Sequence, residues 1–227
     1  MKLGADAAPE ALAASDARAP RRIGVLGGTF DPPHIGHLWL ATLAADAMDL
    51  DRVLFMPAAQ PPHKASEGVS RATDRLLMTR MAIGADAVLG LTAIEMEREG
   101  PSYTIDSVAE LQALHGPDVQ LFLVMAADSL AAIDTWREPD QLLERIEWIV
   151  GPRPDAPLPD RSRLEDRFGA AARRIHLLSG PSLDVSSSEI RARVADGRAI
   201  RYLVPRGVEE LIVDRGLYRR GETRTRS

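Results

Sequence analysis

Two histidines near the start of the chain stand in a setting that can bind phosphate. Residues 27–37 read GGTFDPPHIGH, after an apolar β-branched run and before an amphipathic stretch. Glycines let backbone N–H groups approach a polyanion, and a helix start offers unpaired N–H groups and a positive dipole end. If a helix begins near Pro33, His34 and His37 share a face of its first turn. Both can donate to phosphate oxygens, near which they stay partly protonated. Residues 27–37 therefore predict a phosphate-chain site, and the alternative is a turn with one capping and one exposed histidine.

Several other chemistries are excluded. Residues 27–37 match neither the dinucleotide fingerprint nor the P-loop, and the only lysines, Lys2 and Lys64, do not follow a glycine. The absence of cysteine excludes disulfides, thiolate nucleophiles and Cys-ligated zinc. A net charge of −5 and 4% aromatic residues argue against a general nucleic-acid surface.

The stretch PPHK follows a predicted strand, and the stretch PSYT precedes a predicted helix. Lys64 ends the stretch PPHK and is the single lysine inside the chain, so it is either a solvated loop residue or a mobile charge that follows phosphate oxygens. Ser102 or Thr104, in the stretch PSYT, either caps the next helix or contacts a ligand.

Three further segments also have two interpretations. Asp128 lies just past a strand, where it binds a ribose or caps a helix, and Trp136 is either half-buried core or a stacking surface. Ser186 and Glu189 form a capping-box pattern. The hydroxyls of residues 186–188, with Arg191 one turn later, equally suit a second anion site.

The chain alternates between two kinds of apolar pattern. β-branched-rich runs at 22–26, 52–56, 91–94, 119–124, 147–150 and 174–178 predict strands, and helical spacing appears at 38–48, 73–83, 105–114 and 190–194. Strands too apolar to face water predict an α/β fold with a doubly wound parallel sheet, whose ligands lie beyond the carboxyl ends of the strands. Residues 151–160, with four prolines, predict an irregular surface loop.

The expected organisation is a single domain over residues 21–219, with a small helical cap at about 185–218. Residues 1–20 lack the unbroken apolar region of a signal peptide and are expected to form a flexible extension, as is the tail 220–227. No apolar run is long enough to cross a bilayer. We expect a cytoplasmic enzyme without membrane or nucleic-acid partners.

Residues 27–37 resemble the signature of the HxGH nucleotidyltransferase superfamily, and the longer GGTFDPPHIGHL is similar to bacterial nicotinate-nucleotide adenylyltransferases. PPHK, PSYT, the Asp128–Trp136 spacing and SSSEIR extend the resemblance over about residues 22–218. Ala126 stands where that family has glycine, Val185 where it has isoleucine, and Ser188 where it has threonine. The resemblance implies a Rossmann-like fold and adenylyl transfer from ATP to nicotinate mononucleotide in NAD biosynthesis. It also implies Mg²⁺ with the ATP, without assigned protein ligands; a homo-oligomer is compatible with it.

The resemblance also implies roles for individual residues. It assigns catalysis to His34, His37, Lys64 and Arg191. It assigns ATP binding to the glycine turn and the second anion site, namely Gly27, Gly28, Thr29, Phe30, Gly36, Ser186, Ser187 and Ser188. It assigns mononucleotide binding to Tyr103, Thr104, Asp128 and Trp136, with the tryptophan stacked on the pyridine ring.

Two other functions remain open at this stage. One is a superfamily enzyme with another acceptor, since residues 34–37 also spell the HIGH signature of class I aminoacyl-tRNA synthetases, and pantetheine-phosphate adenylyltransferase has related chemistry. The other is a non-catalytic module that senses ATP or NAD. A sensor has no need of His34, His37 and Lys64, all of which are present.

Overall fold

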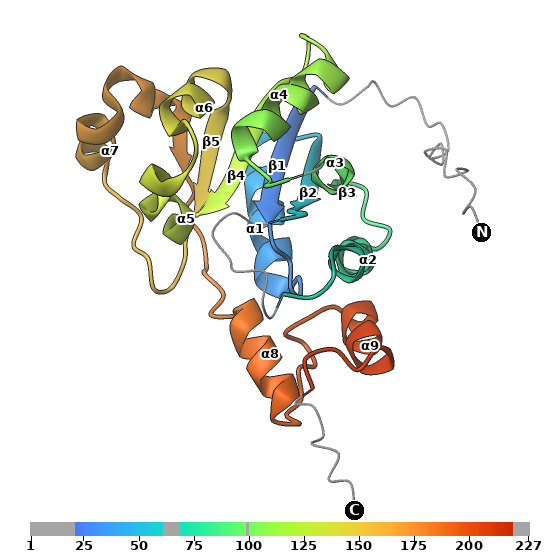
Figure 1. Ribbon diagram of the computed structural model, residues 1–227. Coiled ribbons are helices and arrows are strands. Elements are labelled where there is room, and N and C mark those ends of the chain that lie inside the picture. Colours follow the sequence, from blue (N-terminus) through green and yellow to red (C-terminus); the bar gives the residue numbers. More distant parts are fainter. Residues whose placement is uncertain (1–20, 61–68, 99, 220–227) are drawn as a thin grey trace, which may run out of the picture.

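A single parallel sheet forms the centre of the protein (Figure 1). The computed structural model describes residues 21–60, 69–98 and 100–219. The strands are β1 Arg22–Gly28, β2 Arg52–Pro57, β3 Leu89–Leu91, β4 Gln120–Ala126, β5 Glu147–Gly151 and β6 Ile175–Leu177, and all neighbours run parallel in the order β3-β2-β1-β4-β5-β6. Chain order reverses between β1 and β4, which is where such sheets bind ligands. The predicted doubly wound α/β fold is confirmed.

Helices cover both faces of this sheet. They are α1 Ile35–Met48, α2 Ala72–Ile83, α3 Ile94–Glu97, α4 Thr104–His115, α5 Ala127–Ala131, α6 Pro139–Arg145, α7 Arg161–Phe168, α8 Ser187–Ala195 and α9 Arg206–Asp214, with 3-10 turns at Ile133–Thr135 and Gly169–Arg174. Successive residues of β2 join different cores, because Val53 packs in the cluster that contains the buried residues of α1, whereas Leu54 packs with those of α4 and α6. Burial on both faces explains the continuous apolar runs in the sequence.

One predicted strand is placed wrongly. The sequence predicts a strand at 91–94, whereas β3 ends at Leu91 and Ile94 already begins α3. Period alone cannot separate a short buried strand from the start of a buried helix, and Ile94 is buried. The short helices α3, α5, α6 and α7 were not predicted.

A third apolar cluster joins α2 to the end of the described chain. Met78 of α2 packs with Ile190 of α8 and Val208 of α9. In Figure 1, α8 and α9 lie beyond the carboxyl ends of the strands. Both helices fall within residues 185–218, for which the sequence predicts a cap, and the division into one domain stays a prediction. Among the described residues, no helix has both the length and the apolar character that crossing a membrane requires.

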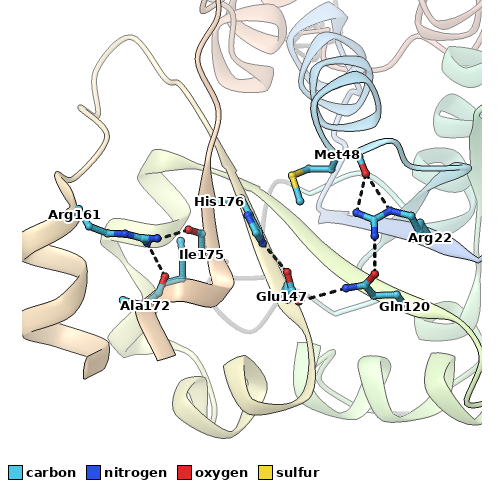
Figure 2. A network of polar contacts seen from close by, with 8 residues as sticks. All are labelled: Arg22, Met48, Gln120, Glu147, Arg161, Ala172, Ile175 and His176. Atoms are coloured by element: carbon cyan, nitrogen blue, oxygen red, sulfur yellow. Dashed lines mark hydrogen bonds and ion pairs between the residues drawn. The ribbon is translucent and has the colours of Figure 1, made fainter. Parts of the chain in front are cut away.

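The opposite, amino-terminal edge of the sheet carries a chain of polar contacts (Figure 2). Arg22 donates to Gln120 at 2.7 Å, Gln120 donates to Glu147 at 3.3 Å, and Glu147 lies 2.6 Å from Nε2 of His176. These side chains connect β1, β4, β5 and β6 at the ends where those strands begin.

Candidate active site

A cavity of about 740 Å³ opens at the carboxyl ends of β1 and β4. Its wall brings together segments that are far apart in the sequence: the glycine turn after β1, the start of α4, the start of α5 and the start of α8. The predicted site residues on this wall are Gly27, Gly28, Thr29, His34, Gly36, His37, Tyr103, Thr104, Asp128, Trp136, Ser186, Ser187 and Ser188.

Three predicted residues are not described as part of the wall. Phe30 is buried behind the turn, where its ring lies edge-on to the ring of His37, with centroids 5.0 Å apart. Arg191 is the fifth residue of α8, and its guanidinium donates to the carbonyl of Asp31. Lys64 lies outside the described residues, so its role stays a prediction.

The two histidines stack on each other at the start of α1. His34 is the N-cap, with extended backbone, and its N–H donates to Nδ1 of His37 at 3.1 Å. The ring centroids are 3.7 Å apart with the planes inclined by 26°. The helix begins two residues later than Pro33, yet both rings still lie together on the cavity wall.

The imidazole of His34 is neutral at pH 7 with the charges of the protein alone. Burial and, to a smaller extent, the nearby Arg153 guanidinium together lower its pKa to about 3. Only 3% of the residue is exposed, and its Nδ1 has no hydrogen-bond partner among the described residues. Without a bound phosphate the ring is therefore neutral, and partial protonation beside anionic oxygens stays a prediction.

Two glycines permit this close packing. A Cβ at Gly28 would lie 2.9 Å from the ring of Phe30, and one at Gly36 would lie 3.0 Å from both His34 Nδ1 and Val185 Cγ1. The family resemblance assigns Gly36 to ATP binding. The structure adds a packing reason, because α1 approaches His34 and Val185 at this point.

The start of α8 is fastened to the glycine turn. Ser186 is the N-cap, and its Oγ accepts from the N–H of Glu189 at 3.1 Å, so the capping interpretation is confirmed. Ser187 Oγ donates to the carbonyl of Pro32 at 2.8 Å. Arg191 donates to the carbonyl of Asp31 at 2.8 Å and to Ser188 Oγ at 3.2 Å. Residues 186–188 also line the cavity, and the interpretation as an anion site stays a prediction.

Aromatic residues gather at another part of the wall. Tyr103 is the N-cap of α4 and makes no side-chain cap bond, and the guanidinium of Arg137 lies 4.9 Å from the centre of its ring. Trp136 is partly buried against the main core while also lining the cavity. Since Tyr103 is the N-cap, neither Ser102 nor Thr104 caps α4. Ser102 Oγ instead accepts from the N–H of Ala59 at 3.1 Å. The indole of Trp136 and the start of α4 therefore line the same cavity.

Asp128 pairs with a cation that the sequence analysis missed. Its Oδ1 accepts from the N–H of Ser129 at 2.9 Å, and its Oδ2 lies 3.7 Å from Nε of Arg153. Arg153 also lines the cavity and donates to the carbonyl of Val185 at 3.2 Å. It belongs to the segment predicted as a surface loop, and its position just past β5 was the available signal.

Relatives of known family share most of this chain. Over 209 residues it is 43% identical to a probable nicotinate-nucleotide adenylyltransferase of Halalkalibacterium halodurans, with 90% of this chain and 94% of the relative covered. A probable nicotinate-nucleotide adenylyltransferase of Moorella thermoacetica is 41% identical over 201 residues, covering 88% and 93%. The chain belongs to the nicotinate-nucleotide adenylyltransferase family. The broader cytidylyltransferase-like family matches residues 25–193.

The fold of this family member is shared with a solved structure. The Plasmodium falciparum nicotinic acid mononucleotide adenylyltransferase complexed with NaAD matches 87% of this chain and 97% of that chain. The TM-score is 0.71 at 18% sequence identity, which shows a common fold.

Behind the glycine turn of this family member lies a buried guanidinium that the sequence pattern did not single out. Arg75 of α2 is 1% exposed and donates to the carbonyls of Thr29, Ala59 and Ser70 at 2.8, 3.0 and 3.1 Å. Its spacing of three residues from buried Met78 placed it on the apolar face, which was the only signal.

Among the described residues, no group of three or more histidine, aspartate or glutamate side chains could hold a metal ion. The cavity wall carries the carboxylates of Glu95 and Asp128, and Arg153 already pairs with Asp128. A Mg²⁺ ion held mainly by substrate phosphates needs few protein ligands, which suits this wall.

Proposed function

We propose that this member of the family transfers the adenylyl group of ATP to nicotinate mononucleotide, giving deamido-NAD and pyrophosphate. The observation that carries this function is the stacked His34–His37 pair, 3.7 Å apart at the start of α1, facing the same cavity as Trp136. Phosphate recognition and an aromatic stacking surface thus share one space of about 740 Å³. Such a volume is within the usual range for small-molecule sites.

In the reaction one phosphorus–oxygen bond forms and another breaks. A phosphate oxygen of the mononucleotide attacks the α-phosphorus of ATP, and the bond from that phosphorus to the bridging oxygen of the β-phosphate breaks. Pyrophosphate leaves with the bonding electrons. No covalent intermediate with the protein is needed, so the rate depends on positioning and on fixed electrostatic stabilisation.

The ATP side is assigned to the glycine turn and to the start of α8. We assign His37 to the α-phosphate and His34, as a neutral donor, to the neighbouring phosphates. The N–H groups and hydroxyls of residues 186–188 face the β- and γ-phosphates. Arg191 holds this site together through Asp31 and Ser188. The resemblance adds Lys64 to the departing pyrophosphate.

The mononucleotide side is assigned to the aromatic wall. Trp136 stacks on the pyridine ring, and backbone N–H groups near Tyr103 and Thr104 meet the pyridine carboxylate at the start of α4. Asp128 accepts from the ribose, and Arg153 adds positive charge beside it. Mg²⁺ enters with ATP as part of the substrate and neutralises charge on the phosphates. A cytoplasmic location and a homo-oligomer stay predictions.

Release of pyrophosphate tests the proposal directly. The chain is incubated with MgATP and, separately, nicotinate mononucleotide, nicotinamide mononucleotide or 4′-phosphopantetheine. We expect the largest kcat/KM with nicotinate mononucleotide, and deamido-NAD as the product. A larger value with phosphopantetheine supports the other-acceptor alternative, and ATP binding by calorimetry without turnover on any acceptor supports the sensor.

A further inference from the structure

A buried carboxylate lies at the mononucleotide end of the cavity and is not used by the proposed reaction. Glu95 of α3 is 3% exposed and shares the wall with Ser102, Tyr103 and Thr104. A buried carboxylate is costly unless hydrogen bonds compensate it. Glu95 therefore needs hydrogen-bond partners within the protein.

Two serines supply those partners. Ser107 Oγ of α4 donates to Glu95 Oε1 at 2.6 Å, and the hydroxyl of Ser102 lies near enough to the carboxylate to act against the rise of its pKa. Arg98 donates to Ser107 Oγ at 2.9 Å. Burial raises the pKa of Glu95, and these serine hydrogen bonds and the Arg98 charge act against that rise. The carboxylate is thus held from both sides of the Tyr103 N-cap.

Ser102 also forms hydrogen bonds with the residues just after β2. Ser102 Oγ accepts from the N–H of Ala59 at 3.1 Å, and the N–H of Ser102 donates to the carbonyl of Gln60 at the same distance. The carbonyl of Ala59 accepts from Arg75. These bonds hold residues 102–104 between α3 and the residues that follow β2. Glu95 contacts both the serine before Tyr103, Ser102, and the serine after it, Ser107.

We propose that Glu95 is a positioning residue that fixes the turn at residues 102–104 and so sets the affinity for the nicotinate end of the mononucleotide. This inference rests on the proposed function, which assigns that turn to the pyridine carboxylate. The hydrogen-bond partners of Glu95 belong to residues 102–107 and not to the glycine turn. Its removal therefore acts on the mononucleotide and leaves ATP binding largely unchanged.

The test separates the two substrates. Steady-state KM values for nicotinate mononucleotide and for ATP are measured for Glu95→Ala, Glu95→Gln and Ser102→Ala, together with the dissociation constant of the mononucleotide by calorimetry. Glu97→Gln is the matched control, because Glu97 is an exposed glutamate on the same short helix. Thermal midpoints report whether each variant is folded.

For Glu95→Ala we expect the KM and the dissociation constant for nicotinate mononucleotide to rise at least about tenfold, which is typical of losing a hydrogen bond to a charged group. The KM for ATP should stay within about twofold. Glu95→Gln should recover part of the loss, because its amide oxygen still accepts from one serine. Ser102→Ala should shift the same constants, and it tests the proposal even if Glu95→Ala does not fold.

Two results would overturn the assignment: an unchanged mononucleotide affinity in the folded variants, or parallel rises in both KM values. A failure of the proposed function is distinguishable, because it appears in the unaltered chain as absence of pyrophosphate release with nicotinate mononucleotide. The calorimetric comparison does not require turnover, so it still decides the role of Glu95.

Discussion

The hydroxyl of Tyr218 donates a hydrogen bond of 2.6 Å to Oδ1 of Asp31, across 187 positions of the chain. Asp31 is 2% exposed, and its Oδ2 accepts from the N–H of Ser70 at 3.1 Å. Its main-chain carbonyl accepts from Arg191. Asp31 therefore joins the glycine turn to the residues just before α2, to α8 and to the residues after α9. The geometry of the turn depends on these contacts.

Tyr218→Phe removes one donor from this buried carboxylate. We expect the free energy of unfolding to fall by about 1.5–3 kcal/mol, the usual range for a hydrogen bond to a charged group. Chemical denaturation measures the change. Tyr202→Phe is the control, because Tyr202 is 81% exposed and also has a positive φ, and it should change stability by less than about 0.5 kcal/mol. Equal effects of the two substitutions would contradict this account.

His37→Ala removes the predicted contact to the α-phosphate. We expect kcat to fall by about 10²–10⁴-fold, the size expected for one preorganised electrostatic contact. The dissociation constant for nicotinate mononucleotide should change little. Pyrophosphate release and calorimetry check the two statements, and His115→Ala, in the last turn of α4, is the control. An unchanged kcat in the His37 variant would remove this residue from the mechanism.

The buried neutral His34 predicts a pH dependence of stability. Its side chain takes up a proton near pH 6.5 when unfolded but only near pH 3 when folded. Between these values the unfolded state binds more protons, so the free energy of unfolding falls as the pH is lowered. The slope from this group is at most about 1.4 kcal/mol per pH unit.

Denaturation of the unaltered chain and of His34→Gln at several pH values between 4 and 7 measures this contribution. The stability difference between the two should shrink or reverse toward pH 4, because glutamine does not titrate. If both proteins lose stability in parallel over the whole range, the histidine is not buried in its neutral form.

Arg75→Lys tests the buried guanidinium. An ammonium group cannot span the carbonyls of Thr29, Ala59 and Ser70 with a planar fork of donors. We expect a loss of about 3 kcal/mol in the free energy of unfolding, since at least one buried carbonyl loses its donor. Arg80→Lys, on the exposed side of the same helix, should cost less than about 0.5 kcal/mol. A loss as small as that of the control would show that Arg75 is replaceable.

The sheet was predictable because its strands bury neighbouring residues on opposite faces. Val53 and Leu54 enter different clusters, and such burial requires the unbroken apolar runs visible in the sequence. The paired histidines were predictable because spacing within one helical turn is a local property. The location of Ile94 was not, since a four-residue run with Leu91, Ala93 and Ile94 apolar fits either the end of a strand or the start of a helix.

The supporting groups of the site could not be found in this way. Arg153 approaches Val185, 32 positions away, and Ser102 approaches Ala59, 43 positions away. A local pattern carries no information about such partners, so a charged residue that becomes buried has the same appearance as one on the surface. Glu95 and Arg75 remained unassigned for this reason, whereas Tyr103 and Trp136 were assigned only through the family resemblance.

The bonds from Ser187, Arg191 and Tyr218 reach back 155, 160 and 187 positions to the glycine turn. Almost the entire polypeptide must therefore have left the ribosome before that turn can form all three hydrogen bonds. An emerging chain can pair β1 with β2 early, whereas the turn gains its last contact only when Tyr218, beyond α9, has emerged. A chain that ends near residue 200 would keep the bonds from Ser187 and Arg191 to this turn but would lose the bond from Tyr218.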